Sequence, residues 1–132
     1  MKKRRKLTPV EWEIMETIWK LEGSPSVRDV MERAFPNGEK AYTTVQTTMS
    51  TLERKGLLRR KKIGLVNFYT PVRSRDDLVM VEMSSLVSRV FDGSIPALAN
   101  SLLSLDGVTL EEVREIKELL DHKERELRGE ES

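Results

Sequence analysis

The 132-residue sequence contains no cysteine and a single histidine, His122. Without cysteine the chain forms no disulfides and has neither a thiolate zinc site nor a cysteine nucleophile, which fits a reducing compartment. His122 lies among charged residues without a partner that suggests a triad, and the serines and threonines lack an obvious base. We therefore expect no enzyme activity, no metal site and no cofactor. We interpret His122 as a surface residue rather than a ligand or pH sensor.

The sequence also lacks a long apolar segment. It has no run of about 18 apolar residues, the length that spans a membrane as a helix. The N-terminus, MKKRRK, leads into a charged segment instead of the apolar stretch of a signal peptide. We expect a soluble, cytoplasmic protein without membrane insertion. Its length and its 38% hydrophobic content permit one compact domain, or a small domain with an appended module.

The formal net charge of +1 hides a strong asymmetry along the chain. Residues 1–73 hold 16 Lys and Arg against 8 Asp and Glu, a net charge of +8, whereas residues 74–132 hold 7 against 14, a net charge of −7. A basic half favours an anionic partner. Five of the cations lie in residues 1–6, which we expect to be a flexible tail. The remaining excess lies at residues 54–62.

Two helices are expected in the first forty residues. Thr8, Pro9 and Glu11 form a capping-box start, and Gly23 ends the helix that follows. Residues 26–35 have the same kind of start, with Ser26 and Asp29 at capping-box spacing, and the helix is expected to stop before a Pro-Asn-Gly turn. In the first helix the apolar residues form one stripe at helical spacing, which predicts a core face: Val10, Ile14, Met15, Ile18, Trp19 and Leu21.

A third helix is expected over residues 43–55, ending at Gly56, and its composition is unusual. At helical spacing, its core face consists of Val45, Thr48, Met49 and Leu52. Thr and Ser weaken a surface helix, yet they fill the opposite face. Short hydroxyl side chains allow close approach to DNA, and Gln can address adenine in the major groove. The alternative is an ordinary surface helix that is rich in threonine. The opposite face and its flanks consist of Thr43, Thr44, Gln46, Thr47, Ser50, Thr51 and Arg54.

Residues 58–63 and 66–72 are expected to form two short strands joined by a turn at Gly64. Three helices followed by a basic hairpin is the order of a winged helix. In that arrangement the third helix enters the major groove and the hairpin cations lie against phosphates. Alternatively, the cations only protect an exposed strand edge from aggregation. The cations expected to bind DNA are Arg60, Lys61 and Lys62.

The acidic half is predicted to be helical throughout. One helix begins at Ser74 and ends at Asp92-Gly93, a brief helix follows over residues 94–103, and Thr109 caps the last one. Their apolar stripes are too wide for an isolated set of three helices, so we expect them to pack against a second copy of the chain. Packing back onto the first domain is the alternative. The residues expected in the dimer contact are Leu86, Val90, Leu120 and Leu127.

The segments LTPVEWEIMETIW, AYTTVQTTMSTLERKGLL and GLVNFYTPV resemble the penicillinase repressor family, which includes the regulators of beta-lactamase and of methicillin resistance. The resemblance covers residues 7 to about 128. It implies an N-terminal winged helix that reads a palindromic operator, and a C-terminal three-helix module that joins two protomers. It also implies a possible partner, because membrane sensor-transducers switch off many members through proteolysis in the C-terminal module.

By position in that family, Thr43, Thr44 and Thr47 fall where the recognition helix contacts bases, and Tyr69 falls on the aromatic residue of the wing. The chain also departs from the family pattern. Thr51 occupies a position that is often Arg or Lys. Leu65 stands where an arginine follows the wing glycine, so the resemblance does not imply an arginine in the minor groove there.

Two further departures concern regulation. The Asn-Phe cleavage pair of the family aligns with Ser101-Leu102, or with Asn100-Ser101 if displaced by one, so the local sequence does not support cleavage. Copper-responsive relatives use a C-terminal cysteine cluster, which this chain lacks.

These observations predict a mainly α protein with a small β-hairpin. Residues 1–73 form a winged helix-turn-helix DNA-binding domain, and residues 74–132 form a helical three-helix dimerisation module. The predicted function is sequence-specific repression of transcription by a homodimer on an inverted-repeat operator in double-stranded DNA. A winged helix that binds only protein is the alternative. It is disfavoured because the exposed face of the third helix lacks Tyr, Trp and Met anchors.

Overall fold

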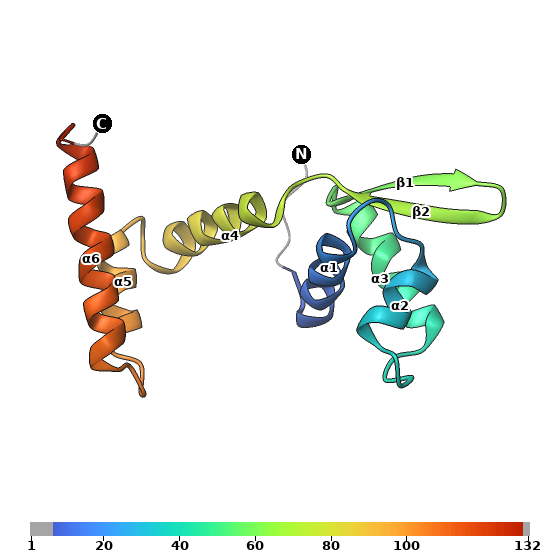
Figure 1. The fold of residues 1–132 in the computed structure, drawn as a ribbon, viewed down its shortest axis with the longest axis horizontal. Helices are drawn as coiled ribbons and strands as arrows, with labels where there is room; N and C mark the ends of the chain where they lie inside the picture. The colour runs from blue at the N-terminus through green and yellow to red at the C-terminus, as the bar shows by residue number, and fades with distance from the viewer. Residues whose placement is uncertain (1–6, 131–132) are drawn as a thin grey trace. The chain divides into compact units, whose positions relative to one another are not determined.

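The computed structural model describes residues 7–130 (Figure 1). The basic tail expected at residues 1–6 lies outside them. The chain divides into two compact units, Met1–Met83 and Ser84–Ser132, and each is described by itself. As predicted, the described part is mainly helical with one two-stranded antiparallel hairpin. In chain order the elements are α1 (Pro9–Leu21), α2 (Val27–Ala34), α3 (Tyr42–Arg54), β1 (Leu58–Ile63), β2 (Val66–Pro71), α4 (Arg75–Val90), α5 (Ile95–Leu103) and α6 (Leu110–Leu127).

Capping boxes start α1 and α2, as the sequence predicts. The Thr8 hydroxyl accepts from the Glu11 amide at 3.2 Å, and the Thr8 amide donates to Glu11 Oε1 at 2.9 Å. Ser26 and Asp29 make the equivalent pair of bonds at α2. These bonds satisfy amides that have no partner inside the helix. After α1 the backbone turns at Glu22, which has a positive φ of 59°.

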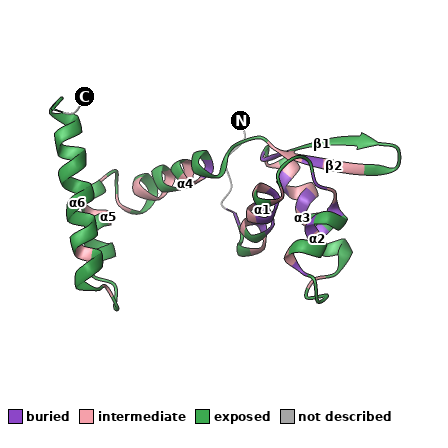
Figure 2. Ribbon diagram, viewed as in Figure 1, coloured by how far each residue is buried: buried purple, intermediate pink, exposed green. Residues whose placement is uncertain are grey.

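The predicted core face of α3 is confirmed. Val45, Met49 and Leu52 are all completely buried. They belong to one apolar core with residues of α1, α2 and the hairpin, and Figure 2 shows buried residues on each of these helices. Thr48 is only half-buried, and its hydroxyl donates to the Thr44 carbonyl at 2.8 Å. The bond lets a hydroxyl lie at the edge of an apolar core without an unpaired donor.

The hairpin is fixed to the helices at its base. Strand β1 pairs with β2 in a register that places Leu58 opposite Pro71 and Ile63 opposite Val66. The Tyr69 amide donates to the Pro25 carbonyl at 2.9 Å. This bond and the bridge between Ser26 and Phe68 attach β2 to the segment between α1 and α2.

The first unit extends beyond the boundary expected at residues 73 and 74. Leu78, in the first turns of α4, is 1% exposed and belongs to the core of this unit. The Trp19 indole N–H donates to the Arg73 carbonyl at 3.0 Å, and Arg75 forms an ion pair with Glu16 at 3.0 Å. The two units therefore meet within α4, between residues 83 and 84, because the start of α4 completes the first core.

The second unit contains the end of α4, α5 and α6. Thr109 and Glu112 form a capping box at the start of α6. Neither α5 nor α6 contains a buried residue, and Figure 2 shows α6 almost entirely exposed. On the solvent side of α6, Lys123 hydrogen-bonds to Glu126 and lowers the pKa of that carboxyl. These helices have the expected apolar residues but no closed core within one chain.

The position of Leu78 leads to a stability prediction. We expect Leu78→Ala to lower the unfolding free energy of the first unit by about 2–5 kcal/mol, because it removes a fully buried side chain. Met80→Ala is the matched control, since Met80 is 66% exposed on the same helix. Urea unfolding followed by tryptophan fluorescence measures the effect, because both tryptophans, Trp12 and Trp19, lie in the first unit. Equal effects of the two substitutions would place Leu78 outside the core.

Candidate nucleic-acid interface

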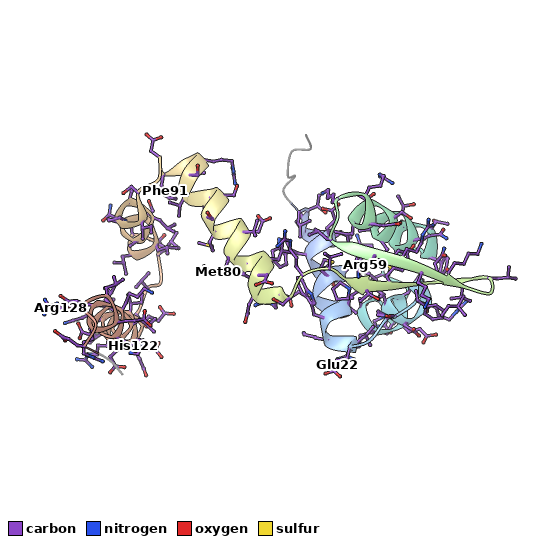
Figure 3. The ribbon with its side chains drawn as sticks, turned by 90° about the horizontal axis from the view of Figure 1, so that it is seen from above. Glu22, Arg59, Met80, Phe91, His122 and Arg128 are labelled. Atoms are coloured by element: carbon purple, nitrogen blue, oxygen red, sulfur yellow. The ribbon has the colours of Figure 1, made fainter. Side chains whose placement is uncertain are left out.

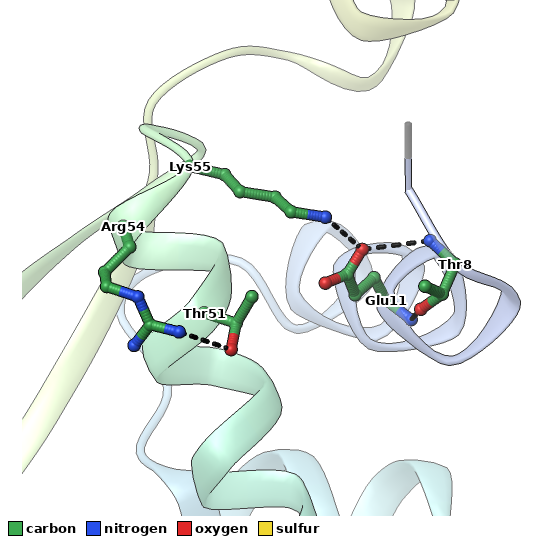
Figure 4. Close-up of polar contacts among 5 residues, drawn as sticks. All are labelled: Thr8, Glu11, Thr51, Arg54 and Lys55. Carbon is green, nitrogen blue, oxygen red and sulfur yellow. Dashed lines mark hydrogen bonds and ion pairs between the residues drawn. The ribbon is translucent and has the colours of Figure 1, made fainter. Parts of the chain in front are cut away.

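The outward face of α3 carries the residues predicted to contact bases. Thr43, Thr44, Gln46 and Thr47 are exposed, while Ser50 and Thr51 are half-buried. The first turn of α3 has no acidic residue. At the other end, the Arg54 guanidinium donates to the Thr51 hydroxyl at 3.1 Å (Figure 4). The face is therefore short, polar and uncharged over three turns, and it ends in a cation.

An ion pair fastens the end of α3 to the start of α1. Lys55 Nζ lies 2.7 Å from Glu11 Oε1, and the same oxygen accepts from the Thr8 amide (Figure 4). Glu11 is 5% exposed, so its carboxylate is stabilised by these two donors rather than by bulk water. In the sequence, Glu11 is recognisable only as a capping residue. The pair was not predictable from local pattern because 44 residues separate its members.

The hairpin carries its cations on both faces. All four residues from Arg59 to Lys62 are exposed. Alternation along β1 places Arg60 and Lys62 on the face that includes Tyr69 of the opposing strand, and Arg59 and Lys61 on the other face. The Tyr69 face is turned towards the helices, and Arg60 Nε lies 3.6 Å from Glu53 Oε1 of α3. Arg60 and Lys62 therefore lie on the α3 side of the hairpin.

The expected DNA contact of Tyr69 requires a correction. The residue is 1% exposed and belongs to the apolar core. The hydrogen bond from its backbone amide to the Pro25 carbonyl holds β2 against the helices. Its ring packs inside the unit and is not available to a DNA groove or a phosphate. From sequence alone, an aromatic residue in a short basic strand is equally compatible with a place in the core and with a contact to DNA. Only its packing in the folded unit distinguishes the two.

The turn of the hairpin is apolar. Gly64 adopts φ 65°, which a tight turn requires and glycine adopts without strain. Around it, Leu65 is 94% exposed, Ile63 57% and Val66 45%. Figures 1 and 3 show the hairpin extending past the helices of its unit, with this turn at the far end. In the sequence, Leu65 stands out only as a departure from a family pattern, and the apolar tip was not predicted.

The predicted dimer residues lie in the second half of the chain. Leu86 is half-buried, whereas Val90, Leu120 and Leu127 are exposed by 57%, 62% and 77%. An open groove of about 970 Å³ lies between α5 and α6. Its apolar lining comes from Leu102, Leu103, Val108, Ile116 and Leu119, and its charged lining, which is mostly acidic, from Glu112, Glu115, Glu118, Asp121 and Arg125.

The remaining candidates are surface features. Ser101 and Leu102 are exposed and lie inside α5, and His122 is an exposed residue of α6. Within residues 7–130, no group of three or more His, Asp or Glu side chains is arranged to hold a metal ion. In that same part of the chain, no helix combines the length and the apolar character that crossing a membrane needs.

Comparison with known proteins places these features in a family. The family model described as penicillinase repressor matches residues 7–122. The penicillinase repressor of Bacillus licheniformis is 30% identical over 126 residues, covering 95% of this chain and 98% of that protein. The methicillin resistance regulatory protein MecI of Staphylococcus aureus is 22% identical over 121 residues, covering 92% and 98%.

A solved structure confirms the predicted fold class of the first unit. The solution structure of the DNA binding domain of the repressor BlaI is similar, with a TM-score of 0.51 and 32% sequence identity. The match covers 58% of this chain and 93% of that one. The order of helices and hairpin, the capped starts of α1 and α2, and a match over most of the chain lead to one conclusion: the chain belongs to the penicillinase repressor family.

Proposed function

We propose that this chain is a sequence-specific DNA-binding repressor of transcription. In this proposal α3 lies in the major groove and the hairpin lies along the phosphate backbone. The observation that carries it is the outward face of α3, where exposed Thr43, Thr44, Gln46 and Thr47 occupy positions at which a solvated helix normally has Glu or Lys. Repression is supported by the names of the relatives, which are repressors and resistance regulators.

The chemistry of this face suits base edges. A threonine hydroxyl donates or accepts a hydrogen bond, and its methyl can contact a thymine methyl. Gln46 can donate to adenine N7 and accept from adenine N6 in the same plane. Because these side chains are short, the helix backbone can approach the groove floor closely. Arg54 at the end of the face, together with the exposed cations of β1, would meet phosphates.

A protein-binding winged helix is the competing function, and the exposed residues disfavour it. Protein interfaces are enriched in Tyr, Trp, Met and Arg at their centre. On α3 only Tyr42, which is 40% exposed, and Arg54 are of these types and accessible, and they lie at opposite ends of the helix. The centre of the face holds threonine and glutamine.

Selection of duplexes from a random pool, followed by titration of single-base variants, tests base recognition. We expect Thr47→Ala to relax discrimination at about one base pair by about 1–3 kcal/mol, because it removes one groove contact from an otherwise intact helix. Unchanged affinity and unchanged sequence preference for this variant would show that the recognition face is misplaced.

Salt dependence supplies the second arm of the same experiment, with a charge-matched control. Arg60→Ala with Lys62→Ala removes two cations from the α3 side of the hairpin, and Arg59→Ala with Lys61→Ala removes two from the opposite side. We expect the first pair to weaken binding to all sequences and to reduce the salt slope by about one to two units. The second pair changes the slope less. Equal salt slopes for the two double variants would show that the cations on both sides of the hairpin contribute alike, without the proposed orientation towards DNA.

We further propose that the repressor acts as a homodimer joined by its second unit. The apolar side chains of α5 and α6 have no closed core in a single chain, and Leu120 and Leu127 remain largely exposed. Surface of this kind is usually covered by a partner. A second copy is the partner favoured here, because a symmetric dimer presents two copies of α3 to half-sites one helical turn apart. The operator is then an inverted repeat.

Light scattering and DNA titration test the dimer together. We expect the wild-type chain to be a dimer at micromolar concentration and Leu120→Glu with Leu127→Glu to be a monomer, because two carboxylates would be buried without partners. The monomer loses the avidity of two linked sites, which is about 10²–10⁴ in affinity for an inverted repeat. Met80→Glu, at an exposed position of α4, is the control. A wild-type monomer that binds a palindrome tightly would contradict the proposal.

Derepression by proteolysis in α5 is the proposed means of release, with a membrane sensor-protease as the partner. Ser101-Leu102 lies inside a helix, so a protease must first open α5 to obtain an extended substrate. Breaking α5 would remove part of the apolar surface proposed to join the protomers. The operator would then be released because each separated domain binds weakly at physiological salt.

Mass spectrometry of the protein from cells exposed to a beta-lactam tests this mechanism. We expect fragments that end near residue 101 to accumulate as the target genes are switched on. An intact 132-residue chain that persists while the genes are expressed would exclude cleavage and favour another signal.

A further inference from the structure

The tip of the β1-β2 hairpin carries a cluster of aliphatic side chains that neither the core nor the phosphate contacts explain. Leu65 is 94% exposed, and Ile63 and Val66 beside it are exposed by about half. Immediately before them, β1 presents four exposed cations, Arg59 to Lys62. A tight turn in solvent normally carries polar residues. An exposed leucine at the end of a cationic hairpin therefore suggests a contact made on binding.

The hairpin is long enough to reach a second groove. Each strand has six residues, which span about 20 Å at roughly 3.4 Å per residue. With α3 in the major groove, the centre of the neighbouring minor groove is half a helical turn away, or about 17 Å. Figures 1 and 3 show the hairpin extending past α2 and α3, with the turn at its far end. The tip can therefore lie at a minor groove while α3 occupies the major groove.

Charge identifies the occupant of this surface. A minor groove is bounded by rows of phosphates, which complement the exposed cations of β1, foremost Arg60 and Lys62 on the α3 side of the hairpin. Apolar side chains do reach the base pairs from this groove, since minor-groove binders insert Leu, Ile or Phe between base steps there. A protein surface would have to combine an apolar patch with anions to suit both Leu65 and the adjacent cations. DNA satisfies both parts of the tip.

We propose that Leu65 packs against the floor of the minor groove beside each half-site and selects A·T over G·C there. This inference rests on the DNA-binding function proposed above. At the centre of the groove an A·T pair presents an adenine C–H, whereas a G·C pair adds the guanine N2 amino group, a hydrogen-bond donor. Leu65 has no acceptor, so covering that amino group leaves it without a partner. Leu65 thus favours base pairs that lack the guanine amino group in the minor groove.

Base analogues isolate this amino group from every other property of the base pair. The probe is a duplex selected by the protein from a random pool, altered one pair at a time about five base pairs from the centre of the α3 contact, half of the helical repeat. Inosine·C keeps the major-groove edge of G·C without the amino group. Diaminopurine·T keeps the edge of A·T and adds it. We expect G·C and diaminopurine·T to weaken binding about fivefold to tenfold, and inosine·C to bind as A·T does.

The protein variants assign that discrimination to Leu65. Leu65→Ala should bind the four pairs equally while its salt slope remains that of the wild type, since no charge is lost. Val72→Ala, an exposed aliphatic residue at the other end of the hairpin, should discriminate like the wild type. Discrimination that persists in Leu65→Ala, or inosine·C that binds as weakly as G·C, would overturn the inference. Those outcomes leave the DNA-binding function intact, whereas a wild-type chain that selects no duplex would overturn both.

Discussion

Burial of one face of α3 is the constraint on which the rest of the molecule depends. Val45, Met49 and Leu52 have no exposed surface, so the rotation of the helix about its own axis is determined by the core. Once these three residues are inside, Thr43 and Thr47 must face outward. Because the core sets this rotation, the outward face needs no strong helix formers and is free to carry poor ones such as threonine.

The same helix is held at its C-terminal end by contacts of a different kind. Lys55 reaches the buried carboxylate of Glu11, and the carboxylate already caps α1 through Thr8. The Glu11 side chain therefore caps the start of α1 and also binds the residue at the end of α3. Burying a carboxylate is costly unless its acceptors are used, and here two donors share one oxygen. A further ion pair, between Arg60 of β1 and Glu53 of α3, links the hairpin to the same helix. The surfaces of α3 and β1 are therefore connected.

The two units differ in how completely a single chain buries its apolar residues. The first closes its core with Leu78 from α4, which lies beyond the boundary suggested by charge and composition. In the second, α5 and α6 contain no buried residue and leave an open groove between them. The first unit can thus position a binding face within one chain. The second leaves apolar side chains of α5 and α6 uncovered within one chain.

Local sequence alone specifies the elements and the two faces of α3, because caps, turn glycines and helical periodicity act over a few residues. The capping boxes at Thr8, Ser26 and Thr109 and the turn at Gly64 are accordingly found where they are predicted. Tertiary structure decided the burial of Tyr69, the place of Leu78 in the first core, and the pairing of Glu11 with Lys55. Each of these depends on residues that are distant in the chain but packed together in the folded unit. Local periodicity does not predict which distant residues will come into contact.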